Sequence, residues 1–349
     1  MSAAARTDIV GPVDRLLAGY NALLAVIWAA VFSIGEPASS LPALGFEIEP
    51  RAALLLALAH AGAVSLPWAI ARLPARPRLP VRVLREAYPL LFVPLGWLEL
   101  DPLIRTLHVG TWDGVIMALD QLVFGIHLDR VWIRAMPQLW FSELMYFSYW
   151  VYLPLIFLPP VAMVLRRDPD AFRDVTLRLL TTYLGCFVVY ILMPTAGPKV
   201  FGLPFHAPAS DGLFFGLVTR AHETGNVFGA AFPSSHVAGA VTVAWLGWRW
   251  FGRGVAALLT IQALGVVMST VYTQNHYAID SLVGVGFALA IQARLVPALE
   301  RLGRRAPAPD PRPSITPPVP VTPLPTPPLP TPPLPTPPLA ASATSDGVP

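Results

Sequence analysis

Two histidines and an aspartate near the C-terminal end of the chain have types and spacing suited to nucleophilic chemistry. His276 and Asp280 are four residues apart, so on a helix they share one face and the carboxylate can reach the ring. A carboxylate bonded to one imidazole nitrogen fixes the tautomer and leaves the other nitrogen free to attack. The alternative is a buried polar pair that pins two helices together.

The segment Pro233-Ser-Ser-His236 has the pattern of a helix start. Ser234 is a good N-cap, and an uninterrupted apolar run follows His236. Unpaired backbone N–H groups and a partial positive charge make a helix N-terminus a site for anions. His236 would lie in the first turn and point at a bound anion. In the alternative reading, Ser234 and Ser235 only cap the helix and His236 is a polar residue at the water boundary.

Lys199 is the single lysine of the chain, and it follows a Gly-Pro pair that predicts a turn. A compact ammonium group held on a turn suits a phosphate oxygen. The alternative is an interfacial lysine whose head group reaches water while its stem lies in the membrane.

The composition places these residues in a membrane protein. Of the 349 residues, 54% are hydrophobic and 13% are charged, about half the charge of a soluble domain, and the mean hydropathy is +0.57. A plain soluble enzyme is therefore excluded. The one cysteine, Cys186, allows no intramolecular disulfide and no thiolate metal site.

Charged residues divide the chain into apolar runs of the length that a bilayer requires, about 20 residues. The expected fold class is all-α, a polytopic integral membrane helix bundle. We expect eight spans, over residues 16–35, 52–71, 87–104, 144–165, 179–198, 234–250, 254–273 and 276–296. In the third of these spans, Glu99 and Asp101 are expected near one membrane face.

The arginines predict the orientation of these spans. With both termini in the cytoplasm, most of the 24 Lys and Arg residues, including the cluster between Arg72 and Arg85, lie inside. The first span is expected to be retained, because no small-residue cleavage site follows it. Lys199, His236 and His276 then reach the outer face of a cytoplasmic membrane, with no acidic cluster beside them to hold a metal.

Residues 306–349 differ from the rest of the chain. The unit Pro-Thr-Pro-Pro-Leu occurs three times without a break from Pro325 to Leu339, which favours an extended, disordered cytoplasmic tail. A partner with an aromatic groove could bind it, and the alternative is an extension without function.

The C-terminal half resembles the type-2 phosphatidic acid phosphatase superfamily, in the branch of the inositol phosphorylceramide synthases. The motif Pro-Ser-x-His is present as Pro233–His236, and the motif Ser-Arg-x5-His-x3-Asp is matched by Ser269, His276 and Asp280, with Thr270 in place of arginine. That branch also tends to lack the arginine and to have Tyr and His-Tyr at this motif, here Tyr272 and His276-Tyr277. The segment 194–199 is similar to the branch's first motif.

The resemblance covers residues 112–297, with N-terminal helices and a basic loop over 1–111 and the tail over 306–349. Asp120-Gln-Leu-Val-Phe-Gly125 and the segment 143–149 resemble further signatures of the same branch. We assign Asp120 and Glu143 no catalytic role, because an interfacial carboxylate that hydrogen-bonds to the end of a neighbouring helix explains their presence. A six-helix core of the superfamily type is expected in this region.

The resemblance implies phosphoryl transfer through a phosphohistidine, without a metal or another cofactor. His276 would attack phosphorus, Asp280 would orient it, and His236 would act first as acid and then as base. Lys199, Ser234, Ser235 and helix N–H groups would hold the phosphoryl oxygens. Either Arg220 or Tyr272 would replace the missing arginine.

The expected substrate is a membrane lipid that carries a phosphate, and no nucleic-acid partner is expected. Water as the acceptor would make the protein a hydrolase, whereas an alcohol such as inositol would make it a transferase. The resemblance also implies a transferase that moves a phospho-headgroup such as inositol phosphate onto a lipid alcohol. The alternative function, from a different class of protein, is that of a non-catalytic lipid-binding or transport protein with the same fold.

Overall fold

The computed structural model describes residues 10–34, 49–72, 87–201, 208–225 and 227–303. The chain divides into two units, Met1–Arg305 and Ala306–Pro349. The second unit, which contains the proline repeats, lies outside the described residues, as does most of the basic loop after Arg72.

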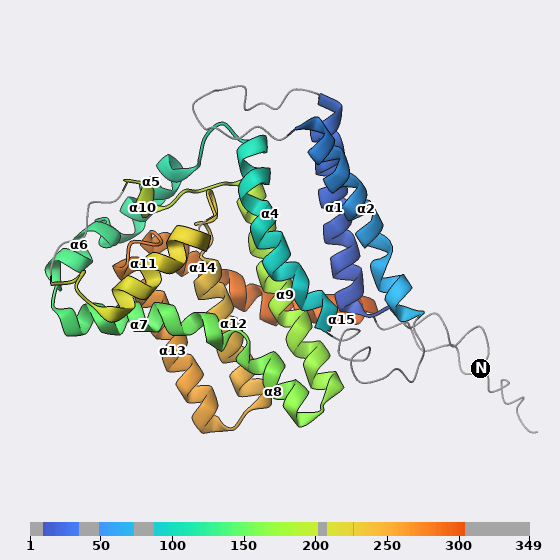
Figure 1. Ribbon diagram of the computed structural model, residues 1–349. Helices are drawn as coiled ribbons and strands as arrows, with labels where there is room; N and C mark the ends of the chain where they lie inside the picture. Colours follow the sequence, from blue (N-terminus) through green and yellow to red (C-terminus); the bar gives the residue numbers. More distant parts are fainter. Residues whose placement is uncertain (1–9, 35–48, 73–86, 202–207, 226, 304–349) are drawn as a thin grey trace, which may run out of the picture. The chain divides into compact units, whose positions relative to one another are not determined.

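Helices form almost all of the described part of the chain. The β-type hydrogen bonding in this part is an isolated parallel bridge between Thr195 and Ala230. Figure 1 shows the helices as a bundle. They are α1 (Pro12–Ile34), α2 (Pro50–Ala71), the 3-10 turn η3 (Tyr88–Leu91), α4 (Phe92–Leu107), α5 (Asp113–Phe124), α6 (Leu128–Ala135), α7 (Leu139–Leu155), α8 (Leu158–Arg166), α9 (Pro169–Leu192), α10 (Pro198–Phe201), α11 (Leu213–Gly225), α12 (Ser235–Trp250), α13 (Arg253–Tyr272), α14 (Ala278–Ala290), the π-helical turn η4 (Ile291–Leu295) and α15 (Val296–Gly303). The predicted all-α membrane fold is confirmed.

Each of the eight predicted spans coincides with one or more helices, and six of these segments are long and apolar enough to cross a membrane. The six are Pro12–Ile34, Pro50–Ala71, Leu139–Arg166, Pro169–Leu192, Arg253–Tyr272 and Ala278–Leu302. The other two helices, α4 and α12, have 16 residues each. At 1.5 Å per residue they are about 24 Å long, less than the roughly 30 Å of a hydrocarbon core.

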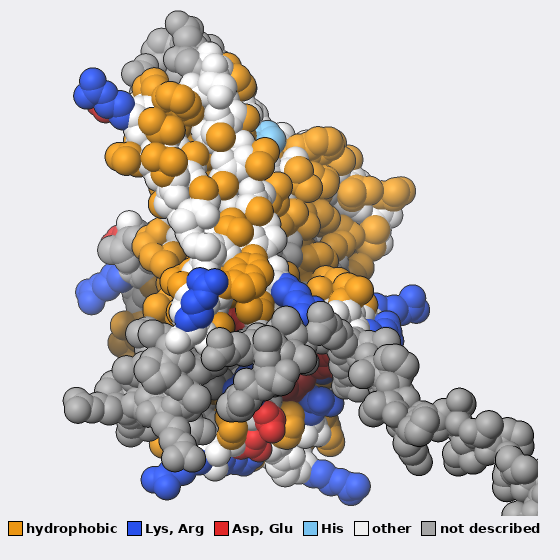
Figure 2. All heavy atoms as spheres, turned by 90° about the vertical axis from the view of Figure 1, so that its right-hand side faces the viewer, with side chains coloured by type: hydrophobic (Ala, Val, Ile, Leu, Met, Phe, Trp, Pro, Cys, Tyr) orange, Lys and Arg blue, Asp and Glu red, His pale blue; other side chains and the backbone are white. Residues whose placement is uncertain are grey.

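The face formed by α1 and α2 has the surface expected of a lipid-facing wall. Figure 2 shows hydrophobic side chains over much of this face and Lys and Arg side chains toward its lower end. Val26 of α1 and Leu55 of α2 are 68% and 67% exposed, respectively. Apolar exposure on this scale marks an interaction surface, and a bilayer supplies the matching environment.

Helix α9 begins at Pro169, about ten residues before the predicted span 179–198. Asp168 caps the helix by accepting a hydrogen bond from Ala171 N at 2.9 Å. Arg178, taken as the border of the span, is instead buried inside the helix, where it donates to Asp174 and Gln292. A buried charge with such partners does not end an apolar helix.

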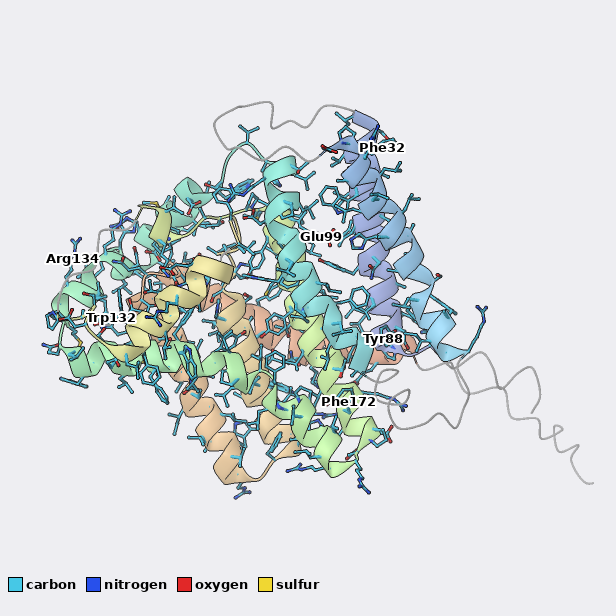
Figure 3. The ribbon with its side chains drawn as sticks, viewed as in Figure 1. Phe32, Tyr88, Glu99, Trp132, Arg134 and Phe172 are labelled. Carbon is cyan, nitrogen blue, oxygen red and sulfur yellow. The ribbon has the colours of Figure 1, made fainter. Side chains whose placement is uncertain are left out.

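Helix α4 carries a second internal charge that the sequence places near a membrane face. Glu99 lies in the middle of α4, where His60 Nε2 of α2 is 2.8 Å from its carboxylate and the Trp28 indole of α1 donates to the same oxygen. Figure 3 shows Glu99 between α4 and α1. The partners on two neighbouring helices explain why the carboxylate is tolerated within the bundle.

Contacts between basic side chains and turns identify one end of the bundle. Arg166 donates to the Trp250 carbonyl oxygen at 2.7 Å, and Arg249 pairs with Asp174 at 2.8 Å. The turn between α8 and α9 therefore meets the turn between α12 and α13 (Figure 1). The segments predicted to carry chemistry lie at the opposite ends of α9, α12 and α13.

Candidate active site

The end of α9 and the segment before α12 run side by side and form the floor of the candidate site. Thr195 N donates to Gly229 O at 3.0 Å, and Ala231 N donates to Thr195 O at 2.9 Å. Gly197 has φ of +86°, a conformation that L side chains rarely adopt, and a Cβ there would lie 3.0 Å from the Ala231 Cβ. This close approach brings the segment before Lys199 to the start of α12.

The predicted helix start at Pro233–His236 is confirmed. Ser234 Oγ accepts a hydrogen bond from Val237 N at 3.3 Å, and α12 begins at Ser235. Ser234 N donates to the Asp280 carbonyl oxygen at 3.1 Å. This bond joins the second chemical segment to the third, so residues about 45 positions apart in the chain share one site.

His276 lies in the turn before α14 and is held by a backbone carbonyl group. Its Nδ1 is 2.9 Å from the Ala231 carbonyl oxygen, which can only accept, so Nδ1 carries the proton. Among the described residues no hydrogen bond involves Nε2, whose lone pair is left free. Burial lowers the pKa of His276 to about 4, so the ring is neutral near pH 7.

Asp280 lies beside His276, as their spacing predicts, but the carboxylate makes no hydrogen bond to the ring. His276 precedes the helix, which begins at Ala278, and the distance from its Nδ1 to Asp280 Oδ2 is 3.6 Å, too long for a hydrogen bond. The same carboxylate oxygen accepts from Tyr277 N at 2.9 Å and caps α14. The Asp280 carboxyl group therefore lies beside the ring and caps α14, while the Ala231 carbonyl oxygen sets the tautomer of His276.

The two histidine rings face each other edge to face, with centroids 5.6 Å apart. His236 stacks on Tyr149 at 4.8 Å, and its Nε2 lies 3.0 Å from the Tyr149 hydroxyl. His236 Nδ1 is buried and makes no hydrogen bond within the described part of the chain. Each ring thus offers one nitrogen that is not committed to a protein partner, as a pair of nucleophile and acid requires.

Tyr149 and His222, which the sequence did not indicate as site residues, extend the site toward Lys199. The Tyr149 hydroxyl also lies 3.1 Å from His222 Nε2, and His222 Nδ1 contacts Lys199 Nζ. Burial, together with the charge of Lys199, lowers the pKa of His222 to about 3, so this ring is neutral. A chain of hydrogen-bonding groups therefore runs from Lys199 through His222 and Tyr149 to His236.

The lysine itself sits on a single helical turn, α10, after the Gly197 turn. Its side chain as a whole is exposed, but its ammonium end turns toward His222. Desolvation of this end lowers the pKa of Lys199 to about 7. The cation expected from the sequence is thus poised to titrate near neutral pH.

The structure places the two candidates for the missing arginine differently. Tyr272 is fully buried, and its hydroxyl donates to the Met136 carbonyl oxygen at 2.8 Å, which commits it to the α6–α7 turn. Arg220 lies on α11 with an exposed side chain, two residues before His222. Thr270 is buried and its hydroxyl pairs with Ser281 at 2.9 Å, so it does not take the place of a cation.

Asp113, at the start of α5, holds two of the chemical segments together. Its carboxylate accepts hydrogen bonds from Ala196 N at 2.8 Å, from Gly197 N at 2.9 Å and from the Tyr277 hydroxyl at 3.0 Å. The side chain is buried. We assign it a positioning role, which the sequence alone did not indicate because its partners are 83 to 164 residues away.

Replacing Asp113 with alanine is expected to lower the free energy of unfolding by about 2–4 kcal/mol, because two backbone N–H groups and a phenol lose their acceptor. Thermal unfolding of the purified protein in detergent measures the effect. The matched control is Asp170→Ala, which removes an exposed ion pair with Arg173 and should change the midpoint little. Equal midpoints for the two variants would contradict the assignment.

The carboxylates that sequence reasoning kept out of catalysis bond helix ends, as predicted. Glu143 accepts hydrogen bonds from Phe214 N and Phe215 N at the start of α11, at 3.0 and 3.3 Å. Asp120 Oδ1 accepts from Ile279 N in the first turn of α14 at 2.9 Å. Both side chains position elements that carry the histidines of the site.

One grouping was not expected. Asp120, His127 and Asp129 come together where α5 turns into α6, and they could hold a metal ion. The sequence suggested no acidic cluster near the site, because the turn at Gly125, with φ of +72°, is what brings the ends of the two helices together.

The fold is that of a helical membrane protein, and two buried histidines face each other at one end of its helices. The profile of the PAP2 superfamily matches residues 115–294, just over half of the 349 residues. The chain belongs to the PAP2 superfamily, and this membership supports a lipid phosphatase-type function. No curated protein and no solved structure matches the chain.

Proposed function

We propose that the protein is a membrane enzyme that removes or transfers a phosphate of a lipid through a phosphohistidine on His276. The observation that carries the proposal is the histidine pair, with rings 5.6 Å apart and Nδ1 of His276 held by the Ala231 carbonyl oxygen. Among the described residues, Nε2 of His276 stays free, which is the state a nucleophilic imidazole needs.

In the first step, Nε2 of neutral His276 attacks phosphorus and a P–N bond forms. The bond from phosphorus to the lipid oxygen breaks, and that oxygen takes a proton from protonated His236, so the lipid leaves as an alcohol. Nδ1 of His236 is suited to this transfer, because Nε2 already contacts Tyr149. The negative charge of Asp280 stabilises the positive charge that develops on His276.

In the second step, the acceptor gives its proton to neutral His236 while its oxygen bonds to phosphorus. The P–N bond breaks, which restores neutral His276 and protonated His236. Water as the acceptor releases inorganic phosphate, and an alcohol such as inositol yields a phosphoester. Lys199, Ser234, Ser235 and the start of α12 hold the phosphoryl oxygens, and Arg220, on the same helix as His222, is the candidate for a further cation.

The chain Lys199–His222–Tyr149–His236 gives the proton on His236 a path to the exposed edge of the site. If Lys199 donates to His222, each link donates to the next and His236 receives a hydrogen bond.

The site opens on the outer face of a cytoplasmic membrane in this proposal. The supporting observation is that the histidines lie at the ends of α12 and α13 remote from Arg166 and Arg249, and arginines at span ends collect on the cytoplasmic side.

A product analysis tests the function. Purified protein is incubated with a lipid carrying a ³²P-labelled terminal phosphate, with and without inositol. Release of labelled phosphate in both reactions supports hydrolysis, and labelled inositol phosphate supports transfer to an alcohol acceptor. Absence of both products with every lipid phosphate tried, in protein that binds these lipids, would contradict the enzyme and favour a lipid-binding or transport protein.

The pKa of Lys199 predicts a pH dependence that a single substitution should change. Because the pKa is lowered to about 7 by desolvation, the ammonium is present below pH 7 and is lost as the pH rises through 7. We expect kcat/KM to fall above pH 7 in the wild type. Lys199→Arg keeps its charge at every accessible pH, so this falling limb should move to higher pH.

The two proteins are compared on the same substrate, so that titration of the substrate phosphate affects both profiles equally. A falling limb at the same pH in wild type and Lys199→Arg would assign the titration to another group.

A further inference from the structure

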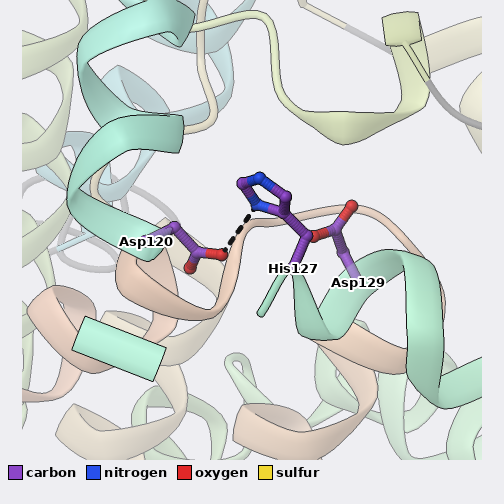
Figure 4. Close-up of side chains that lie close together, drawn as sticks. All are labelled: Asp120, His127 and Asp129. Carbon is purple, nitrogen blue, oxygen red and sulfur yellow. Dashed lines mark ion pairs between the residues drawn. The ribbon is translucent and has the colours of Figure 1, made fainter. Parts of the chain in front are cut away.

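We propose that Asp120, His127 and Asp129 form a binding site for a divalent transition-metal ion, best matched by Zn²⁺, at the turn between α5 and α6. One ligand atom from each residue can be chosen so that all three lie within 4.8 Å of one another. Figure 4 shows the three side chains close together at the turn, with the ion pair between Asp120 and His127 dashed.

Unsatisfied buried atoms point to a missing ligand. Asp120 Oδ2, Asp129 Oδ1 and His127 Nδ1 are buried and make no hydrogen bond within the described part of the chain. The side chains of Asp120 and Asp129 are 0% and 2% exposed, respectively. Buried carboxylates are normally paired or bound to a metal. Asp129 Oδ1 has neither, and Asp120 Oδ2 has only the 3.4 Å contact with His127 Nδ1.

The protein charges around the cluster do not supply that partner. Arg130 Nε is 3.9 Å from Asp129 Oδ2, and its side chain is 36% exposed, so this is a weak pair that leaves Oδ1 unmatched. His127 Nδ1 lies 3.4 Å from Asp120 Oδ2, too far for a strong hydrogen bond. One divalent cation would neutralise both carboxylates.

The donor set and its spacing favour Zn²⁺. Zinc binds imidazole nitrogen and carboxylate oxygen at about 2.0–2.2 Å, so neighbouring ligands of a tetrahedral ion are about 3.3–3.5 Å apart. The distance of 3.4 Å between His127 Nδ1 and Asp120 Oδ2 agrees with this spacing. The wider limit of 4.8 Å for the three ligand atoms together means that the Asp129 carboxylate would move toward the other two on binding. The imidazole argues against Mg²⁺ and Ca²⁺, which prefer all-oxygen ligand sets.

The same residues also hold the segment on which His276 lies. Asp120 Oδ1 accepts from Ile279 N at 2.9 Å, and the Asp129 carbonyl oxygen accepts from Gln274 Nε2 at 3.0 Å. A cation bridging the two aspartates would therefore fix both sides of the turn that carries His276. The role is one of positioning, and binding of the ion does not depend on the reaction proposed above.

Metal titration of the full chain tests this site. Protein purified in detergent without a histidine tag is stripped with a chelator, and ZnCl₂ is added in a calorimeter, with bound zinc counted by mass spectrometry. We expect one Zn²⁺ per chain and a rise in the unfolding midpoint. His127→Ala and Asp129→Asn should each weaken binding more than about 100-fold, since even second-shell changes cost 10–100-fold.

The matched control is His108→Ala, which removes a histidine that contacts the Ile191 carbonyl oxygen outside the cluster and should bind zinc as the wild type does. Because His127 is partly exposed, its variant keeps the test valid if Asp129→Asn does not fold. Absence of stoichiometric Zn²⁺ from the wild type, or equal affinity in wild type and His127→Ala, would overturn the site. Neither outcome would bear on phosphate release, which is assayed separately.

Discussion

Replacing His276 with alanine is expected to lower the rate of phosphate release by about 10⁴-fold or more, because removal of a nucleophile removes the covalent route. The geometry makes this position special. Nδ1 is held by the Ala231 carbonyl oxygen at 2.9 Å, so the opposite nitrogen is aimed and unprotonated. No other described imidazole faces His236 in the same way.

The measurement is initial-rate release of phosphate from a lipid phosphate by protein reconstituted in vesicles. His108→Ala is the control for a general effect of losing a histidine, and its rate should stay near that of the wild type. Size-exclusion chromatography and the unfolding midpoint show whether each variant is folded. A transport or lipid-binding protein would show altered lipid affinity in His276→Ala, and turnover retained in the folded variant would rule out this residue as the nucleophile.

Replacing His236 with asparagine is expected to slow release of a lipid alcohol by about 10²–10⁴-fold, the usual contribution of general acid–base catalysis. The size of the loss should depend on the leaving group. A lipid alcohol needs a proton as it departs, whereas p-nitrophenolate leaves without one. For p-nitrophenyl phosphate the first step should therefore be affected far less than for the lipid.

The comparison is made by single-turnover kinetics, which separate formation of the phosphoenzyme from its hydrolysis. In His236→Asn the activated substrate should phosphorylate the enzyme quickly and then stall, because the base for the second step is missing. Equal losses of the first step for both substrates would show that His236 positions the phosphate and does not transfer a proton.

The membrane helices were largely predictable from the sequence, because the cost of burying a charge in lipid limits where charges can stand. The prediction erred where the protein supplies a partner for the charge. Arg178 pairs with Asp174 and Gln292 inside α9, and Glu99 pairs with His60 inside the bundle. Gln292 and His60 are distant in the chain from the charges that they bind, so a count of charges cannot detect these partners. Asp174 lies one helical turn before Arg178, and a count of charges records it only as a further charge.

The candidate site was predictable to the extent that its residues lie in local motifs. Ser234 caps α12 as its residue type indicates, and His236 and His276 meet. The ring of His276 is oriented by the backbone carbonyl group of Ala231. Every residue type has this group, so the sequence does not indicate the contact. His222 and Asp113 act across 23 to 164 residues, and only tertiary structure brings such partners together.

The measurement that tests the central claim most directly is the chemical trapping of the phosphoenzyme. Protein is mixed with a ³²P-labelled lipid phosphate, quenched in alkali, where a phosphorus–nitrogen bond to histidine survives, and digested for mass spectrometry. We predict label on His276 that is lost in acid and is absent from His276→Ala. Turnover without any label on His276, or label on a different side chain, would contradict it.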